Sequence, residues 1–200
     1  MKKTLAFVDV ETTGLNACLH EIIEISIVRV YPDGREDIYT TKIRPERLEY
    51  AEPTALEING YNEEEWHSAP SADLVMPRIA EMLTDCVIIA HNVRFDEEFI
   101  AESLHRNGLR ARYDRRTIDT ITLAHEHLYH LPFLSLDSIR RYFGWSLSGG
   151  HRAERDALDC MRLYRKLCRA SVISRLSWRA AYYLRPIFRR AIAIIRKFFF

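Results

Sequence analysis

The stretch FVDVETTGL, residues 7–15, combines a short apolar strand, two acids and a glycine turn. Side chains along a β-strand alternate between the two faces of a sheet, so we expect Asp9 and Glu11 on the same face. Two neighbouring carboxylates repel each other, and removing them from water is costly unless cations lie between them. Mg²⁺ and Mn²⁺ favour such oxygen clusters. Taken alone, however, an acid pair of this kind is more often solvated at a strand end.

The rest of the chain alternates between apolar runs and amphipathic segments. We predict strands at 5–10, 22–31, 36–43 and 86–91. Helical spacing of apolar residues predicts helices at 63–83, with loop residues around Pro70, and at 95–109, 135–145 and 153–170. Residues 116–128 have the pattern of a short strand that runs into a helix. Three hairpin strands followed by strand–helix alternation indicate an α/β domain with a mixed sheet.

Composition is consistent with one ordinary domain, since 48% of the 200 residues are hydrophobic. Asp9 and Glu11 interrupt the apolar run at the start of the chain. The run is therefore shorter than the roughly 7–15 apolar residues of a secretory signal. No window approaches the ~18 apolar residues of a membrane span. The four cysteines form no C-x-x-C pair, so we expect neither a zinc site nor a disulfide framework. We therefore expect a soluble, cytoplasmic protein.

Charge divides the chain into a body and a tail. Residues 161–200 contain 11 Lys/Arg and no Asp/Glu, whereas residues 1–160 contain 18 Lys/Arg and 28 Asp/Glu, a net charge of −10. We predict a domain at 1–170 and a basic amphipathic helical tail at 171–200, with Pro186 bending or breaking its helix. The tail could pack on the body, a protein partner or a second copy, bind nucleic acid, or lie on an anionic membrane. We favour packing over nucleic acid, and nucleic acid over membrane.

Two more motifs carry acids. HNVRFD, residues 91–96, places Asp96 just after the strand predicted at 86–91. HRAERDA, residues 151–157, places His151 five residues before Asp156, in the first turns of a predicted helix. Considered singly, Asp96 is more simply an acid at the start of a helix, and His151 a loop residue.

Together and in this order, DVET (9–12), HNVRFD and HRAERDA resemble the histidine-containing branch of the DEDD-type 3′→5′ exonuclease superfamily. That branch includes bacterial polymerase III proofreading exonucleases, the ribonuclease T group and oligoribonucleases. Supporting stretches are ALEINGY (55–61), IDT (118–120) and LSLDSI (134–139), so the resemblance covers residues 4–168. The sister branch has a tyrosine where this chain has Arg152. The resemblance implies a ribonuclease H-like fold, a five-stranded mixed sheet with helices on both faces.

The resemblance also implies a mechanism. Asp9, Glu11, Asp96 and Asp156 would hold two divalent cations, Mg²⁺ or Mn²⁺, about 3.5–4 Å apart around the scissile phosphate. By similarity, Asp9 would bridge both ions and Asp96 would act partly through bound water. His151 would be the general base, since a histidine pKa near ~6.5 suits proton uptake close to neutrality. The products would be nucleoside 5′-monophosphates.

Six residues are candidates for substrate contact: Thr12, Thr13, Gly14, Leu15, Asn92 and Phe95. The first three could offer backbone N–H groups to the terminal nucleotide. Leu15 resembles a family residue that wedges against the last bases, although a turn-packing role explains it equally well. Asn92 and Phe95 could line the groove, and Phe95 is better explained as a core residue.

Three functions remain open at this point. The DVETTGL and HNVRFD motifs resemble the proofreading type most, which favours a 3′→5′ exonuclease on single-stranded or frayed DNA ends over RNA. The first alternative is an exoribonuclease of the same fold that trims short RNA or tRNA ends. The second is a non-catalytic nucleic-acid-binding adaptor, which we would expect to have lost at least one of the four acids, and none is missing.

Overall fold

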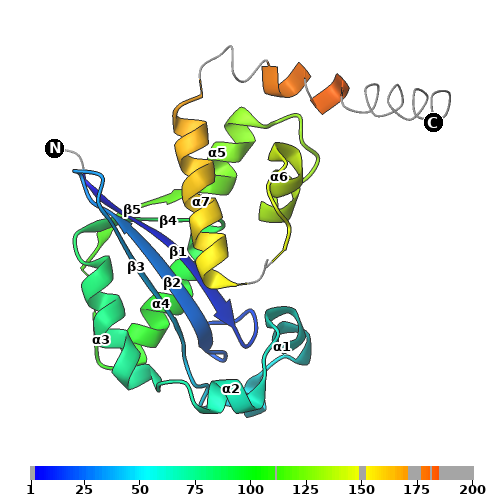
Figure 1. Ribbon diagram of the computed structural model, residues 1–200. Helices are drawn as coiled ribbons and strands as arrows, with labels where there is room; N and C mark the ends of the chain where they lie inside the picture. The colour runs from blue at the N-terminus through cyan, green and yellow to red at the C-terminus, as the bar shows by residue number, and fades with distance from the viewer. Residues whose placement is uncertain (1–2, 111, 149–151, 171–176, 181, 185–200) are drawn as a thin grey trace.

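The computed structural model describes residues 3–110, 112–148, 152–170, 177–180 and 182–184 (Figure 1). Five strands form one sheet: β1 (Thr4–Thr12), β2 (Ile22–Val30), β3 (Glu36–Lys42), β4 (Cys86–Ala90) and β5 (Asp114–Asp119). Their order across the sheet is β3-β2-β1-β4-β5. The pairs β1–β2 and β2–β3 are antiparallel, whereas β1–β4 and β4–β5 are parallel. The predicted mixed sheet is confirmed, with β1 at its centre.

The helices follow the predicted order, with two additions, η1 and α1. Their bounds are η1 Leu48–Tyr50, α1 Pro53–Asn59, α2 Glu63–His67, α3 Ala72–Leu83, α4 Val93–Arg106, α5 Thr120–His127, α6 Leu136–Phe143 and α7 Ala153–Cys168. The stretch predicted at 63–83 is two helices, α2 and α3, separated by the loop around Pro70. Helix α1 is absent from our prediction, although Pro53 at its first turn and left-handed Gly60 at its end are typical helix boundary signals.

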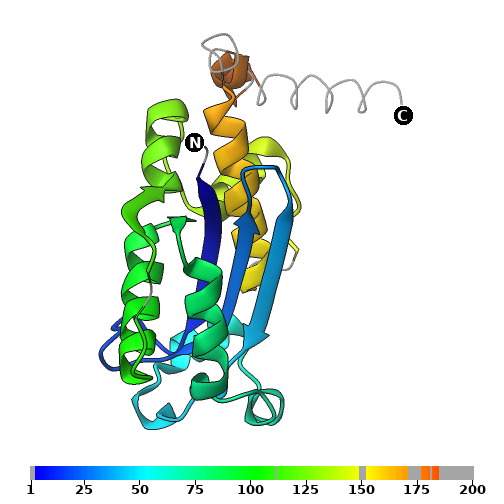
Figure 2. The ribbon, with the colours of Figure 1, turned by 90° about the vertical axis from the view of Figure 1, so that its left-hand side faces the viewer.

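Helices cover both faces of the sheet. On one face, Ala6, Val8 and Val10 of β1 pack in a core with residues of α3 and α4. On the other face, Phe7 of β1 packs with Ala157 and other residues of α7. Figure 2 shows α3 and α4 on the opposite side of the sheet from α7. The alternation along β1 therefore assigns its odd-numbered residues to the α7 side.

A third core lies among α5, α6 and α7, beside the sheet, and it includes residues of the tail. Trp178 lies edge-on to Phe143 at 5.4 Å between ring centroids, and Tyr182 lies 5.8 Å from Tyr142. The described part of the tail thus packs on the body, and the rest of the segment 171–200 lies outside the described residues. Within the described residues, no helix has the length and apolar character needed to cross a membrane.

Candidate active site

The carboxyl end of β1 is the place where the two acids of the opening stretch meet a third. Pairing between β1 and β4 ends at Phe7 and Ile89, so the last residues of β1 have a strand neighbour on the β2 side only. Asp9 and Glu11 share the α7 side with Phe7, and the first turns of α7 bring Asp156 beside them. One carboxylate oxygen from each of these three acids lies within 4.8 Å of the others.

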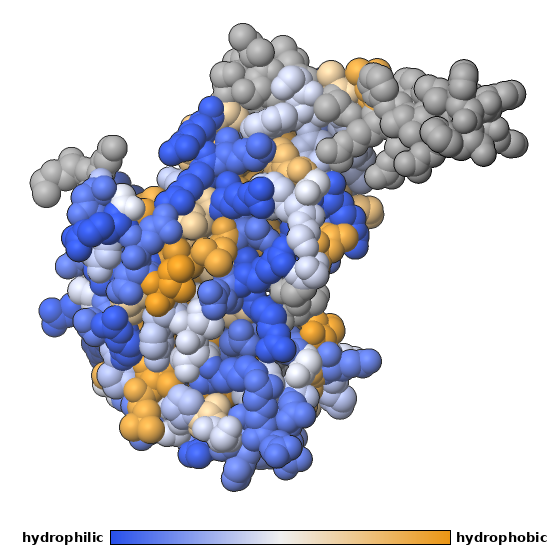
Figure 3. All heavy atoms as spheres, viewed as in Figure 1, coloured by the Kyte–Doolittle hydropathy of each residue, from blue (hydrophilic) through white to orange (hydrophobic). Residues whose placement is uncertain are grey.

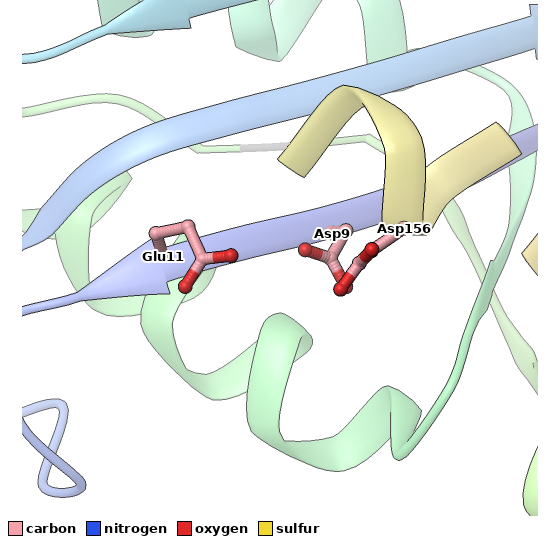
Figure 4. Close-up of side chains that lie close together, drawn as sticks. All are labelled: Asp9, Glu11 and Asp156. Carbon is pink, nitrogen blue, oxygen red and sulfur yellow. The ribbon is translucent and has the colours of Figure 1, made fainter. Parts of the chain in front are cut away.

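We call Asp9, Glu11 and Asp156 the acid cluster. Figure 4 shows the Asp9 and Asp156 carboxylates close together, with Glu11 further along β1. The strand supplies two members at a spacing of two residues, and the helix supplies the third from 145 positions later in the chain. The sheet and α7 therefore bring together three of the four acids that the sequence motifs indicated.

Asp96, the fourth acid, is buried at the start of α4 with 4% of its surface exposed. Its Oδ1 accepts a hydrogen bond from the backbone N–H of Val10 at 3.2 Å. That N–H is available because β4 does not pair with this part of β1. Asp96 thus lies against the strand that carries Asp9, but it is outside the group of three converging oxygens.

The electrostatics of the site favour cation binding. Burial, followed by the charges of Asp96, Asp156 and Glu11, raises the pKa of Asp9 well above its usual range. Burial, followed by Asp156 and Glu24, raises the pKa of Glu11 to about 8. Burial also raises the pKa of Asp96. Clustered acids that ionise reluctantly without a counter-charge, and that offer only oxygen ligands, suit divalent cations that prefer oxygen.

Arg140 of α6 is a component of the site that our reading of the sequence missed. Its side chain is 1% exposed and donates to Asp156, to Asp159 at 2.8 Å and to Asp137 at 2.9 Å. Asp156 Oδ1 is the acceptor, so the guanidinium fixes one oxygen of a cluster member. Leu136, Ile139 and Arg140 are all buried along α6, and an arginine in such an apolar stripe was the available signal.

Glu24 of β2 is a buried acid that the sequence motifs did not indicate. It lies directly opposite Glu11 in the β1–β2 pairing and is 5% exposed. Burial raises its pKa, whereas the neighbouring cations Arg152 and Lys42 lower it. The Arg152 Nη1 to Glu24 Oε2 distance is 3.7 Å. Glu24 and Arg152 therefore connect β2 to the residue that precedes α7.

The turn after β1 is tightly built. Thr12 Oγ1 donates to the carbonyl of Gly14 at 2.7 Å. The Thr13 N–H donates to the Glu21 carbonyl at 2.9 Å, so Thr13 does not offer this group to a nucleotide, contrary to our expectation. The reason is that Thr13 closes the turn between β1 and β2. A Cβ at Gly14 would lie 2.4 Å from the ring of His20, so any larger residue would require this ring to move.

The remaining candidates differ in exposure. Leu15 is 76% exposed in the turn after β1, so its side chain does not pack there. Asn92 is exposed, adopts a left-handed conformation with φ of 81° before α4, and donates its N–H to Asp119 at 3.2 Å. Phe95 is half-buried and packs on Phe99 at 4.8 Å between centroids, which agrees with a core role. His151 lies outside the described residues.

Comparison with known proteins identifies the family. Residues 6–164 match the Exonuclease family (RNase_T). The chain belongs to this exonuclease family. It is 35% identical over 154 residues to the PolC-type DNA polymerase III of Thermotoga maritima, and 31% identical over 160 residues to the 3′-5′ exonuclease DinG of Staphylococcus epidermidis.

The aligned region covers most of this chain but only a small part of each of those relatives. The aligned region is 77% of this chain and 11% of the polymerase, and 80% of this chain and 17% of DinG. Escherichia coli exonuclease I, solved in complex with a dT13 oligonucleotide, has the same fold with a TM-score of 0.73 and 20% identity. That alignment covers 84% of this chain and 41% of exonuclease I. The predicted ribonuclease H-like exonuclease fold is confirmed.

Proposed function

We propose that this exonuclease domain removes nucleotides from the 3′ end of single-stranded or frayed DNA by a metal-dependent mechanism that releases nucleoside 5′-monophosphates. The convergence of Asp9, Glu11 and Asp156 in a member of the exonuclease family carries this proposal. The match to parts of a PolC-type DNA polymerase III and of the 3′-5′ exonuclease DinG supports DNA as the substrate.

Two divalent cations, Mg²⁺ or Mn²⁺, are the proposed cofactors. The acid cluster would hold them together with Asp96, which lies against the same strand. When bound, the cations supply positive charge that offsets the charge on the phosphodiester during attack by water. Because Arg140 already binds Asp156 Oδ1, we expect Oδ2 of this carboxylate to face a cation.

His151 is the proposed general base on the evidence of the HRAERDA motif. It would accept the proton of the attacking water. Replacement by alanine, His151→Ala, is expected to slow hydrolysis about 10²- to 10⁴-fold. Stabilisation of the protein by Mn²⁺ in a thermal unfolding experiment should survive this change, because no cation ligand is removed. Unchanged hydrolysis rates across pH would remove His151 from the mechanism.

The test of the function is digestion of 5′-labelled DNA and RNA oligonucleotides of one sequence with Mg²⁺, Mn²⁺ or a chelator. We expect a ladder that shortens from the 3′ end of DNA, faster than for RNA, and none with chelator. Asp9→Asn should lower the rate by about a thousandfold without loss of stability, since it relieves repulsion. Asp33→Asn, which changes an exposed acid in the β2–β3 turn, is the matched control. Wild-type rates in Asp9→Asn would refute the proposal.

Faster digestion of RNA would favour the alternative exoribonuclease function, and binding without digestion would favour the adaptor. The presence of all four acids argues against an adaptor. Protein partners of the tail, including a second copy of this chain, stay a separate prediction that sedimentation of the full chain would test.

A further inference from the structure

A cavity of about 740 Å³ opens beside α6. Arg140 connects α6 to the acid cluster, whereas its neighbours Ser138, Arg141 and Tyr142 line this cavity. The other walls come from the loops on either side of α6 and from the tail. Tyr182 and Tyr183 form the tail wall, and they lie beyond residues 6–164, the part shared with the exonuclease family. We call this the aromatic cavity.

Large apolar side chains of the aromatic cavity face solvent. Phe133 is 71% exposed, Tyr183 is 55% exposed and Leu147 is 45% exposed. Tyr182 and Tyr183 lie 5.4 Å apart between ring centroids. In the space-filling view, a small group of hydrophobic residues lies beside α6, next to pale and hydrophilic ones (Figure 3). Aromatic groups gathered at an exposed, hollowed surface mark a binding site more often than a solvated face.

The charge of the aromatic cavity selects the kind of partner. No Asp or Glu is among its lining residues, within the part of the chain that the structure describes, and Arg141 is one of them. The Arg162 guanidinium lies over the ring of the lining residue Trp145 at 4.2 Å. Residues 1–160 carry a net charge of −10, so this acid-free, arginine-bearing surface differs from most of the body. It complements a polyanion that also offers flat apolar faces.

Single-stranded nucleic acid has that chemistry. Proteins that bind it combine cations for the phosphates with aromatic side chains on which bases stack. A double strand would hide the faces of its bases, and an acidic peptide would seldom offer flat rings. We propose that the aromatic cavity binds unpaired bases of a single DNA strand, upstream of the 3′ end held at the acid cluster. The position of the strand rests on the proposed function.

The experiment measures binding without hydrolysis. Fluorescein-labelled oligothymidylates of about 4 and about 16 nucleotides are titrated with the full chain in chelator, and anisotropy gives the affinity. Arg140 faces the acid cluster, whereas Ser138 and Tyr142 line the aromatic cavity about half a helical turn away on α6, so we expect only the long strand to span both. In the double variant Phe133→Ala/Tyr183→Ala we expect affinity for the long strand to fall about tenfold, and affinity for the short strand to stay unchanged.

Two controls make the result specific. Leu74→Ala removes an equally exposed side chain, 70% exposed, from α3, which does not line the aromatic cavity, and should change neither affinity. Ultraviolet cross-linking of a long strand that contains 5-iododeoxyuridine should attach it to peptides of the segment 131–147 or to Tyr182 and Tyr183. Phe133 and Tyr183 are exposed, so their loss should leave the fold intact.

The proposal is overturned if the double variant binds the long strand as wild type does, or if both strands lose affinity equally. Cross-links confined to other segments would also overturn it, and the aromatic cavity would then serve a different occupant, such as an apolar protein segment. These measurements do not depend on catalysis. If the double variant shows the length-dependent loss of affinity while the wild-type protein digests no strand, the proposed function is refuted and the aromatic cavity remains a binding site.

Discussion

The two ends of α7 lie in opposite environments, one charged and one apolar. At its first turns, Asp156 joins the acid cluster, and a single buried cation, Arg140, holds it there. At its last turns, Leu163 and Leu167 are buried among apolar residues of α5 and aromatic residues of α6 and the tail. The first end concentrates like charges, which costs stability unless cations are bound, whereas the second buries apolar surface, which supplies stability.

The difference shows how the apolar contacts of one helix can hold a cluster of mutually repelling acids in place. Burial, followed by the charges of neighbouring acids, raises the pKa of Asp9 and Glu11, so these acids ionise reluctantly without a counter-charge. Apolar contacts along α7 with Phe7 and with the third core hold the helix in place regardless of charge. The stability of the first end should therefore depend on pH, on cations and on Arg140, and that of the second end should not.

The largest effect on stability is expected from Arg140→Met. This change leaves Asp156 and Asp159 without their buried cation, and breaking a buried ion pair from one side costs about 3–5 kcal/mol. Urea denaturation in chelator measures the loss. Arg165→Met is the matched control, because Arg165 pairs with Glu36 at the surface, where a pair is worth about 1 kcal/mol or less. Equal losses for the two variants would contradict the special role of the first end.

A smaller effect on stability is expected when a change of pH ionises Glu11. Because folding raises the pKa of Glu11 from 4.5 to about 8, the folded protein binds the proton more tightly than the unfolded chain does. The corresponding stability, several kcal/mol, is fully present below pH 4.5 and is lost as pH rises through 8. Urea denaturation in chelator at both ends of this window should show the loss.

Glu11→Gln is the variant that isolates this contribution. The amide has no proton to lose, so stability of the variant should fall less between the two pH values than that of wild type. Adding Mn²⁺ at the higher pH should restore the stability of wild type and do less for the variant, since a cation replaces the proton. A wild-type protein in chelator that gains stability as pH rises through this window would contradict the sign that we derive.

Local patterns in the sequence predicted the first end of α7 only in part. The period of two along β1 placed Asp9 and Glu11 on one face, and the HRAERDA motif placed Asp156 in an early helical turn. The partner of Asp156 was missed, because Arg140 reaches it from 16 residues earlier through the packing of α6 on α7. No local period records such a contact.

Two other predictions failed, each for a reason that local patterns do not record. Our expectation for the Thr13 N–H failed because its partner, the Glu21 carbonyl, lies across the turn between β1 and β2. Helix α1 was missed because it has seven residues, of which only Asn59 is buried, so it leaves almost no apolar period. Long strands and helices with one buried face were predicted well, because their buried positions carry apolar residues at a regular spacing along the sequence.

The smallest effect on stability is expected from a substitution at the second end of α7. The Lys166 ammonium lies 4.7 Å from the ring centre of Phe143 and 5.3 Å from that of Trp178. Lys166→Met keeps the apolar stem and removes only the charge, so we expect a loss of about 0.5–1 kcal/mol in urea denaturation. The loss should be the same with Mn²⁺ and with chelator, because the acid cluster is at the other end of the helix. A loss that vanished when Mn²⁺ was added would mean that the two ends of α7 are coupled, and the contrast between them would have to be abandoned.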